Sequence, residues 1–349
     1  MKESPFIKKM RIRFTGFLTG SMVKGADHHK HIDVSPKKIK RILVSRPNHR
    51  LGNQLLMTPL IQELEQTFPE AKIDLFVKGG ASFAIFQNYD SIDQIISLPK
   101  EHFKHLLKYL SVWSKLKARK YDLVVNGDKY SSSGNLCVKL ARAPYKVFGD
   151  RETEMSSLPE EFQHIAKYAV YDFRQALDPS IYQLNDKEVP KLNIKLSADE
   201  QQKGKQLLKD LVGNDRPTIC LFTNATGNKI YSSDWWMPFY KQLKTEFPEH
   251  NIVELLPIEN TSQINFTAPN LYSKDLREMA AFIEATDLFI TPDNGTMHLA
   301  ASTDTPVIGF FKVTSIKKYK PYGGLNRAFD TKKTSIHDWI GAAHDILKK

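Results

Sequence analysis

Residues 288–301 read LFITPDNGTMHLAA and predict a strand, a tight turn and a helix in succession. Asp293 or Asn294 can cap the helix, and Gly295 lets a ligand approach the backbone closely. Free N–H groups at the helix start and the positive end of its dipole favour an anion such as a diphosphate. His298, one turn later, could add a hydrogen bond or a positive charge. The residues alone leave open an ordinary capped helix with a buried histidine.

The same alternation of short apolar runs and helical segments extends through most of the chain. Runs at 42–44, 73–77, 123–125, 218–222, 252–256, 288–290 and 307–310 predict strands. Such runs suit strands that helices cover on both faces, as in a parallel sheet. With 349 residues and a polar stretch near 176–192, we expect two α/β domains, 41–185 and 186–349, after a basic extension, 1–40.

Positive charge is concentrated in the first part of the chain. Residues 1–150 hold 26 Lys and Arg against 13 Asp and Glu, whereas the rest hold 24 against 26. This imbalance indicates an anionic partner. Nucleic acid is not expected, because no recognition motif for it is present.

The extension has the pattern of an amphipathic helix. Its apolar residues fall on one side at helical spacing, with lysines elsewhere: Phe6, Ile7, Met10, Phe14, Phe17 and Leu18. Such helices lie in the headgroup region of a membrane, although a frayed terminus or a helix docked on the protein's own core is equally compatible. No run approaches the roughly 18 apolar residues that span a bilayer, and the start lacks a secretory signal. We expect a cytoplasmic protein.

Several common functional motifs are absent. The chain has no GxGxxG, GxxxxGK[ST], GxSxG or HExxH, which argues against classical NAD enzymes, P-loop NTPases, serine hydrolases and zinc proteases. It also lacks an Asp-x-Asp triplet, and two cysteines are too few for a thiolate metal site. We therefore expect no metal and no cofactor.

Further polar residues follow the predicted strands. Thr226 and Lys229 come after 218–222 and could contact phosphate oxygens, and Glu259 comes after 252–256 and could bind a ribose. Solvated loops are the alternative for all three. Because parallel strands end at one edge of a sheet, we expect these side chains to face one cleft.

The first domain offers a second glycine loop that meets a helix start. Arg46, His49, Arg50 and Gly52 follow the strand at 42–44 and suit an anionic ligand. The loops after the next two predicted strands contain Lys78, Asp128 and Lys129 on the same side.

Together these segments resemble the ADP-heptose:lipopolysaccharide heptosyltransferases of glycosyltransferase family nine. Residues 50–60, RLGNQLLMTPL, are similar to the family's opening loop and helix, and residues 293–301 to its donor-binding D-[ST]-G-x-x-H-[LI]-A-A segment. Lys229 with Trp235 and Trp236 matches the loop that family members place against the donor phosphates. The resemblance spans about residues 41–325.

The resemblance implies a GT-B fold, in which two Rossmann-like, doubly wound parallel-sheet domains face a central cleft. It implies an inverting transfer without metal, which moves a heptose or related sugar from a nucleotide diphosphate, ADP-heptose, to a lipopolysaccharide or other anionic glycolipid core. The enzyme would work as a peripheral protein at the cytoplasmic surface of the inner membrane. Donor binding would fall to Thr226, Lys229, Glu259, Asp293, Asn294, Gly295, Thr296 and His298, and acceptor binding to Arg46, Arg50, Gly52, Lys78 and Lys129.

One position departs from the family pattern. The family has Asp after the glycine of the first loop, proposed as the base that deprotonates the acceptor hydroxyl, whereas this chain has Asn53. An amide cannot act as a base, so Asp128 and His49 are the candidates to replace it. Two other functions fit the same fold: a sugar-nucleotide epimerase, and a non-catalytic protein that binds nucleotide sugars or glycolipids.

Overall fold

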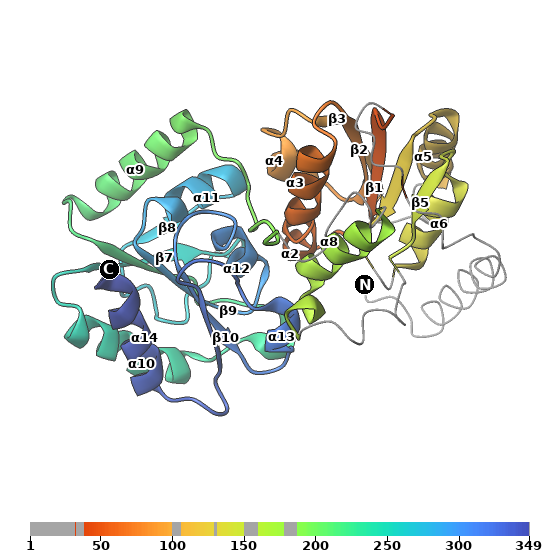
Figure 1. The fold of residues 1–349 in the computed structure, drawn as a ribbon. Helices are drawn as coiled ribbons and strands as arrows, with labels where there is room; N and C mark the ends of the chain where they lie inside the picture. Colours follow the sequence, from red (N-terminus) through yellow and green to blue (C-terminus); the bar gives the residue numbers. More distant parts are fainter. Residues whose placement is uncertain are drawn as a thin grey trace.

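The computed structural model describes Ile32 and residues 38–99, 106–128, 131–149, 160–177 and 187–348. Two parallel sheets with helices on both faces form two domains that lie side by side (Figure 1). We call residues 38–177 the first domain, 198–348 the second domain and 187–197 the connecting segment. The boundary expected at 185 and 186, the amphipathic pattern at residues 6–18, and Lys129 lie outside the described residues.

The first sheet has the strand order β3-β2-β1-β4-β5. Its strands are β1 (Arg41–Arg46), β2 (Lys72–Lys78), β3 (Ile92–Leu98), β4 (Leu123–Asn126) and β5 (Tyr145–Val147). Its helices are α2 (Leu51–Leu55), α3 (Thr58–Thr67), α4 (Ala81–Phe86), α5 (Leu106–Ala118), α6 (Ser132–Leu140) and α8 (Ile165–Ala176), with a 3-10 turn η1 (Glu160–Gln163). The order reverses between β1 and β4, where open α/β sheets bind their ligands.

The second sheet has the strand order β11-β10-β9-β6-β7-β8 and the Rossmann connectivity. Its strands are β6 (Thr218–Leu221), β7 (Asn251–Leu256), β8 (Asn270–Tyr272), β9 (Leu288–Pro292), β10 (Val307–Phe311) and β11 (Arg327–Asp330). Its helices are α9 (Ala198–Val212), α10 (Ser233–Glu246), α11 (Leu276–Glu284), α12 (Gly295–Ala300), α13 (Ile316–Tyr319) and α14 (Ile336–Leu347), with a 3-10 turn η2 (Gly227–Lys229). Here the order reverses between β6 and β9.

Three hydrophobic clusters hold the layers together. The α5 and α6 side of the first sheet has one cluster, and the α10 and α14 side of the second sheet has another, built around Trp236 and Trp339. The third is continuous across the domain boundary, because it joins Leu60 of α3 to Ile194 of the connecting segment and Phe282 of α11. The two sheets therefore share an inner core.

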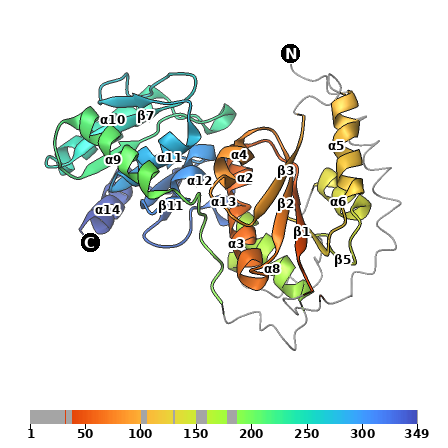
Figure 2. The ribbon, with the colours of Figure 1, turned by 90° about the horizontal axis from the view of Figure 1, so that it is seen from above.

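Helices of the two domains pack directly on each other. The first domain's α2 contacts α12, and its α4 contacts α11, so that these helices lie between the two sheets (Figure 2). Farther along the same interface, His164 before α8 is hydrogen bonded through Nε2 to the carbonyl of Lys320, at 3.0 Å. The interface thus extends along the carboxyl-terminal side of both sheets.

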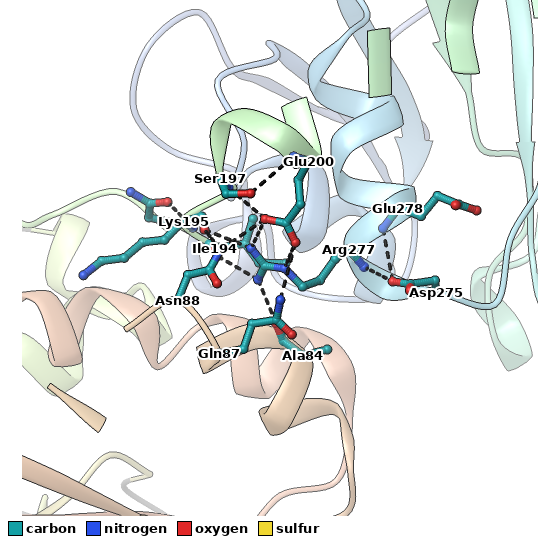
Figure 3. A network of polar contacts seen from close by, with 11 residues as sticks. Ala84, Gln87, Asn88, Ile194, Lys195, Ser197, Glu200, Asp275, Arg277 and Glu278 are labelled. Atoms are coloured by element: carbon teal, nitrogen blue, oxygen red, sulfur yellow. Dashed lines mark hydrogen bonds and ion pairs between the residues drawn. The ribbon is translucent and has the colours of Figure 1, made fainter. Parts of the chain in front are cut away.

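Arg277, at the start of α11, connects both domains and the segment between them (Figure 3). Its Nη1 donates to the carbonyl of Ala84 in α4 at 2.8 Å and to that of Ile194 at 3.1 Å. Its Nη2 donates to the carbonyl of Lys195 at 2.9 Å and to Glu200 Oε2 at 2.8 Å, while Nε bonds the other carboxylate oxygen of Glu200. The carbonyl of Ala84 lies in the last turn of α4, where it has no partner within the helix, so Arg277 caps that helix.

Within the part of the chain that the structure describes, no helix has both the length and the apolar composition needed to cross a bilayer. The two cysteines, Cys137 and Cys220, are buried thiols. Burial raises the pKa of Cys137 to about 12.

Candidate active site

The two glycine loops predicted from the sequence meet at the domain interface. Gly52 in α2 is packed against the ring of His298 in α12. A β-carbon at Gly295 would lie 3.2 Å from Leu51 Cβ, which is a tight contact, whereas a β-carbon at Gly52 would clash with the His298 ring. The loops that end β1 and β9 therefore lie in direct contact, and groups of both domains can act on one ligand.

Asp293 is buried at the end of β9 and already has partners. Lys229 in η2 forms an ion pair with its Oδ2 at 2.7 Å, and the hydroxyl of Thr314 donates to the same oxygen. Lys229 thus lies in the loop after β6, as predicted, and its ammonium group is paired with the carboxylate of Asp293. A bound phosphate would have to share this lysine with Asp293.

Asn294 is the helix cap. Its side-chain oxygen accepts from the N–H of Met297 at 2.8 Å, and its Nδ2 donates to the carbonyl of Asn224 at 2.8 Å. This amide therefore ties α12 to the loop after β6.

His298 is buried and neutral at pH 7. Burial lowers its pKa to about 4, with Asp293 acting in the opposite direction and the positive charges of Lys229 and Arg46 adding to the decrease. A neutral imidazole still has one ring N–H that it can donate to a ligand.

Arg46 is fully buried where β1 ends. Its Nη1 donates to the carbonyl of Gly127 at 2.6 Å, which connects the ends of β1 and β4. Its Nε and Nη2 have no hydrogen-bond partner among the described residues. Burial lowers the pKa of the guanidinium, and the negative charge of Asp128 opposes part of this decrease.

The candidate bases lie on neighbouring loops of the first domain. Asp128 is half-buried, and its backbone is fixed by the amide of Asn126, whose Nδ2 donates to the carbonyl of Asp128 at 3.0 Å. His49 is exposed, and Asn53 is half-buried within α2. Arg50 is exposed beside His49.

Two buried polar residues that sequence reasoning missed hold the loops of the site. Gln54 donates through Nε2 to the carbonyls of Asn48 and Lys78, at 3.0 and 2.8 Å, and accepts from the hydroxyl of Ser82. It thereby fixes α2 to the loop after β2. A glutamine in an apolar helical run is the only signal the sequence offers for this role.

Glu254 performs the corresponding task in the second domain. It accepts from the hydroxyls of Thr223 and Ser262, both at 2.6 Å, and so connects the loops after β6 and β7. Burial raises the pKa of its carboxyl group, and the two hydroxyl bonds oppose that increase. The sequence signal for this role is the position of an acidic residue, Glu254, within an otherwise apolar strand.

The remaining predicted residues range from exposed to fully buried. Thr226 and Glu259 are exposed on their loops, and Lys78 is fixed through its backbone carbonyl. Trp236, which accompanied Lys229 in the resemblance, is fully buried in the second domain's outer core. Thr296 is buried in α12 next to Gly295.

Two Rossmann-like parallel-sheet domains whose carboxyl-terminal loops meet at one interface define a GT-B fold. The model of glycosyltransferase family 9 (heptosyltransferase) matches residues 109–337, and the chain belongs to this family.

The chain is 24% identical over 283 residues to the lipopolysaccharide core heptosyltransferase OpsX of Haemophilus influenzae, covering 76% of this chain and 78% of that protein. Among solved structures, it resembles a family 9 glycosyltransferase from Veillonella parvula with a TM-score of 0.70 and 18% identity, over 88% of this chain and 97% of that one. It also resembles the E. coli heptosyltransferase WaaC solved with ADP, with a TM-score of 0.66 and 15% identity, over 88% and 99% of the two chains.

Proposed function

We propose that this protein transfers a heptose from ADP-heptose to the core of a lipopolysaccharide. The observation that carries the proposal is the contact of Gly52 with His298, which brings the ligand-binding edges of both sheets to one place. Membership of the family supports the reaction class. The relative in Haemophilus influenzae supports the acceptor, and the ADP in the WaaC structure supports the donor.

The two domains would divide the substrates between them. Lys229, Asn294, Gly295, Thr296 and His298 surround the donor in the second domain, with Asp293 positioning Lys229 and with Thr226 and Glu259 at the nucleotide end. Arg50, Lys78 and Lys129 of the basic first domain attract the phosphate and carboxylate groups of the acceptor. Gly52 lets the two substrates approach each other.

The transfer would invert the sugar and need no metal. The acceptor hydroxyl oxygen forms a bond to the anomeric carbon, while the bond from that carbon to the β-phosphate oxygen breaks and its electron pair stays on the diphosphate. Lys229 and a hydrogen bond from His298 stabilise the charge that develops there. Because Asn53 cannot take the hydroxyl proton, Asp128 is the proposed base, with His49 as the second candidate.

The same proposal places the protein peripherally at the cytoplasmic face of the inner membrane, where its acceptor lies. The excess of basic residues in 1–150 supports attraction to anionic lipid. Sedimentation with vesicles tests this point. We expect binding to vesicles containing phosphatidylglycerol and none to vesicles of phosphatidylcholine alone, and equal recovery with both would contradict it.

Turnover tests the function itself. With ADP-heptose and a core lipopolysaccharide that lacks heptose, we expect release of ADP that depends on the acceptor and is unaffected by EDTA. The anomeric configuration of the product, read by NMR, should be opposite to that of the donor. Conversion of the donor without acceptor would instead support an epimerase, and binding without any conversion would support a non-catalytic protein.

A further inference from the structure

Arg46 has hydrogen-bonding capacity that its surroundings leave unused. The side chain is fully buried, yet only Nη1 has a partner, the carbonyl of Gly127. Nε and Nη2, which have none among the described residues, form one edge of the planar guanidinium. That edge accepts two oxygens of a phosphate or carboxylate side by side.

A buried cation without a counter-ion is costly to maintain. Burial lowers the pKa of Arg46 because it penalises the charged form, and the charge of Asp128 offsets this only through space. Other buried arginines of the described chain are paired: Arg174 with Glu63 and Arg277 with Glu200. Since buried polar groups are normally satisfied, an unpaired edge of this kind points to a ligand.

The surroundings of Arg46 indicate which ligand it meets. Its positive charge acts on His298 of α12, and the guanidinium is influenced in turn by Tyr319 of α13. Both groups belong to the second domain, whose Lys229 also acts on His298. The positive charge of Arg46 therefore acts across the domain interface on a group that is proposed to hold the donor.

We propose that the Nε and Nη2 edge of Arg46 binds the β-phosphate of the nucleotide-sugar donor. This inference rests on the proposed function. Both domains would then contribute to the phosphate site, because Lys229 supplies one cation and Arg46 the other. It also replaces the acceptor role that the sequence suggested for Arg46. Solvent does not reach either nitrogen, so the phosphate enters only when the groups that cover them move apart.

Calorimetric titration of the full chain with inorganic pyrophosphate, ADP and AMP tests the assignment. Pyrophosphate carries the diphosphate without a base, and AMP lacks the β-phosphate. In Arg46→Lys, which keeps the charge but loses the paired donors, we expect about a tenfold loss of affinity for pyrophosphate and ADP, and in Arg46→Met a loss of about a hundredfold. AMP should bind all forms equally.

Arg119→Lys, in the same domain but paired with Asp74 and Asp93, is the matched control and should change none of these affinities.

Thermal unfolding separates binding from a structural role. Because the unpaired guanidinium costs stability in the free protein, Arg46→Met should keep or raise the melting temperature while it loses pyrophosphate binding. If Arg46→Met does not fold, the comparison of Arg46→Lys with wild type decides.

The assignment would be overturned if the wild-type protein did not bind pyrophosphate, or if the Arg46 variants bound it with unchanged affinity. It would also be overturned if these variants bound ADP normally but had a higher KM for the lipopolysaccharide. That result would give Arg46 an acceptor-binding role. A protein that binds pyrophosphate through Arg46 but releases no ADP from ADP-heptose would leave this site standing and contradict only the proposed function.

Discussion

A β-carbon on Gly52 would lie 2.6 Å from Cδ2 of His298. No real pair of non-bonded carbons approaches so closely, so the glycine is what allows α2 and α12 to touch. This is also the point where the proposed acceptor and donor halves of the site meet. The close approach of the two domains at the site therefore depends on the missing side chain of Gly52, beside the tight contact of Gly295 with Leu51.

Gly52→Ala should force the two helices apart. Because the methyl group meets a ring packed in the interface, we expect a cost of about 1 to 3 kcal/mol in stability and a larger loss in kcat/KM. Steady-state kinetics and thermal unfolding measure the two effects. Gly80→Ala is the control, since no atom lies within 4 Å of the added carbon and its φ is not in the left-handed region. Normal turnover of Gly52→Ala would show that the contact is not needed.

Asp128→Asn should reduce kcat by about 10² to 10⁴ without weakening ADP binding, if this residue is the base that Asn53 cannot be. His49→Gln should then have little effect. The comparison uses single-turnover rates at saturating donor. A reversed result, with the loss in His49→Gln, would transfer the role to His49.

Acid should destabilise the protein through two buried histidines. Burial lowers the pKa of His164 to about 3 and that of His298 to about 4, whereas the unfolded chain protonates histidine near pH 6.5. The neutral forms therefore add stability that is fully present above pH 6.5 and is lost as the pH falls toward 4, by about 3 kcal/mol for each residue.

Urea unfolding between pH 7 and 4.5 measures this slope. His298→Gln should flatten it, while His337→Gln, at an exposed position, should leave it unchanged. An identical slope in wild type and His298→Gln would contradict the assignment.

Arg277→Met should loosen the connection between the domains. The variant leaves the carbonyls of Ala84, Ile194 and Lys195 without this donor and removes the cation that holds the pKa of Glu200 at about 2. We expect a loss of about 3 to 5 kcal/mol in the free energy of unfolding.

Lys203→Met is the control for that variant. It removes an exposed ion pair with Glu278 between the same two helices and should cost less than about 1 kcal/mol. Equal effects of the two variants would show that the contacts of Arg277 across the domains add nothing.

The sequence predicted the central strands of both sheets and missed every edge strand. The seven apolar runs correspond to β1, β2, β4, β6, β7, β9 and β10, whereas β3, β5, β8 and β11 form the four edges. The physical reason is burial on two faces, which gives a continuous apolar run only in a central strand. β8, for example, is three residues long and partly exposed.

The helical stretch that follows β1 is divided, because α2 ends at Leu55 and α3 begins at Thr58 with Pro59 in its first turn. Proline suits the start of a helix, which local pattern alone places poorly.

The candidate site could also be predicted only in part. Residues at or just after the ends of central strands, such as Arg46, Asp128 and Asp293, could be placed from the sequence because parallel strands end together. Arg277, Gln54 and Glu254 could not, since their partners lie in other loops or in the other domain. The unpaired edge of Arg46 is likewise a property of the three-dimensional packing.

The bond between Arg277 and the carbonyl of Ala84 joins residues 193 positions apart in the chain. During synthesis the first domain leaves the ribosome long before Arg277 has been made, and domains generally fold in that order. The last turn of α4 and the shared inner core must therefore wait for the second half of the chain. We therefore expect docking of the domains to be the final step of folding, with the first domain's part of the shared core exposed until then.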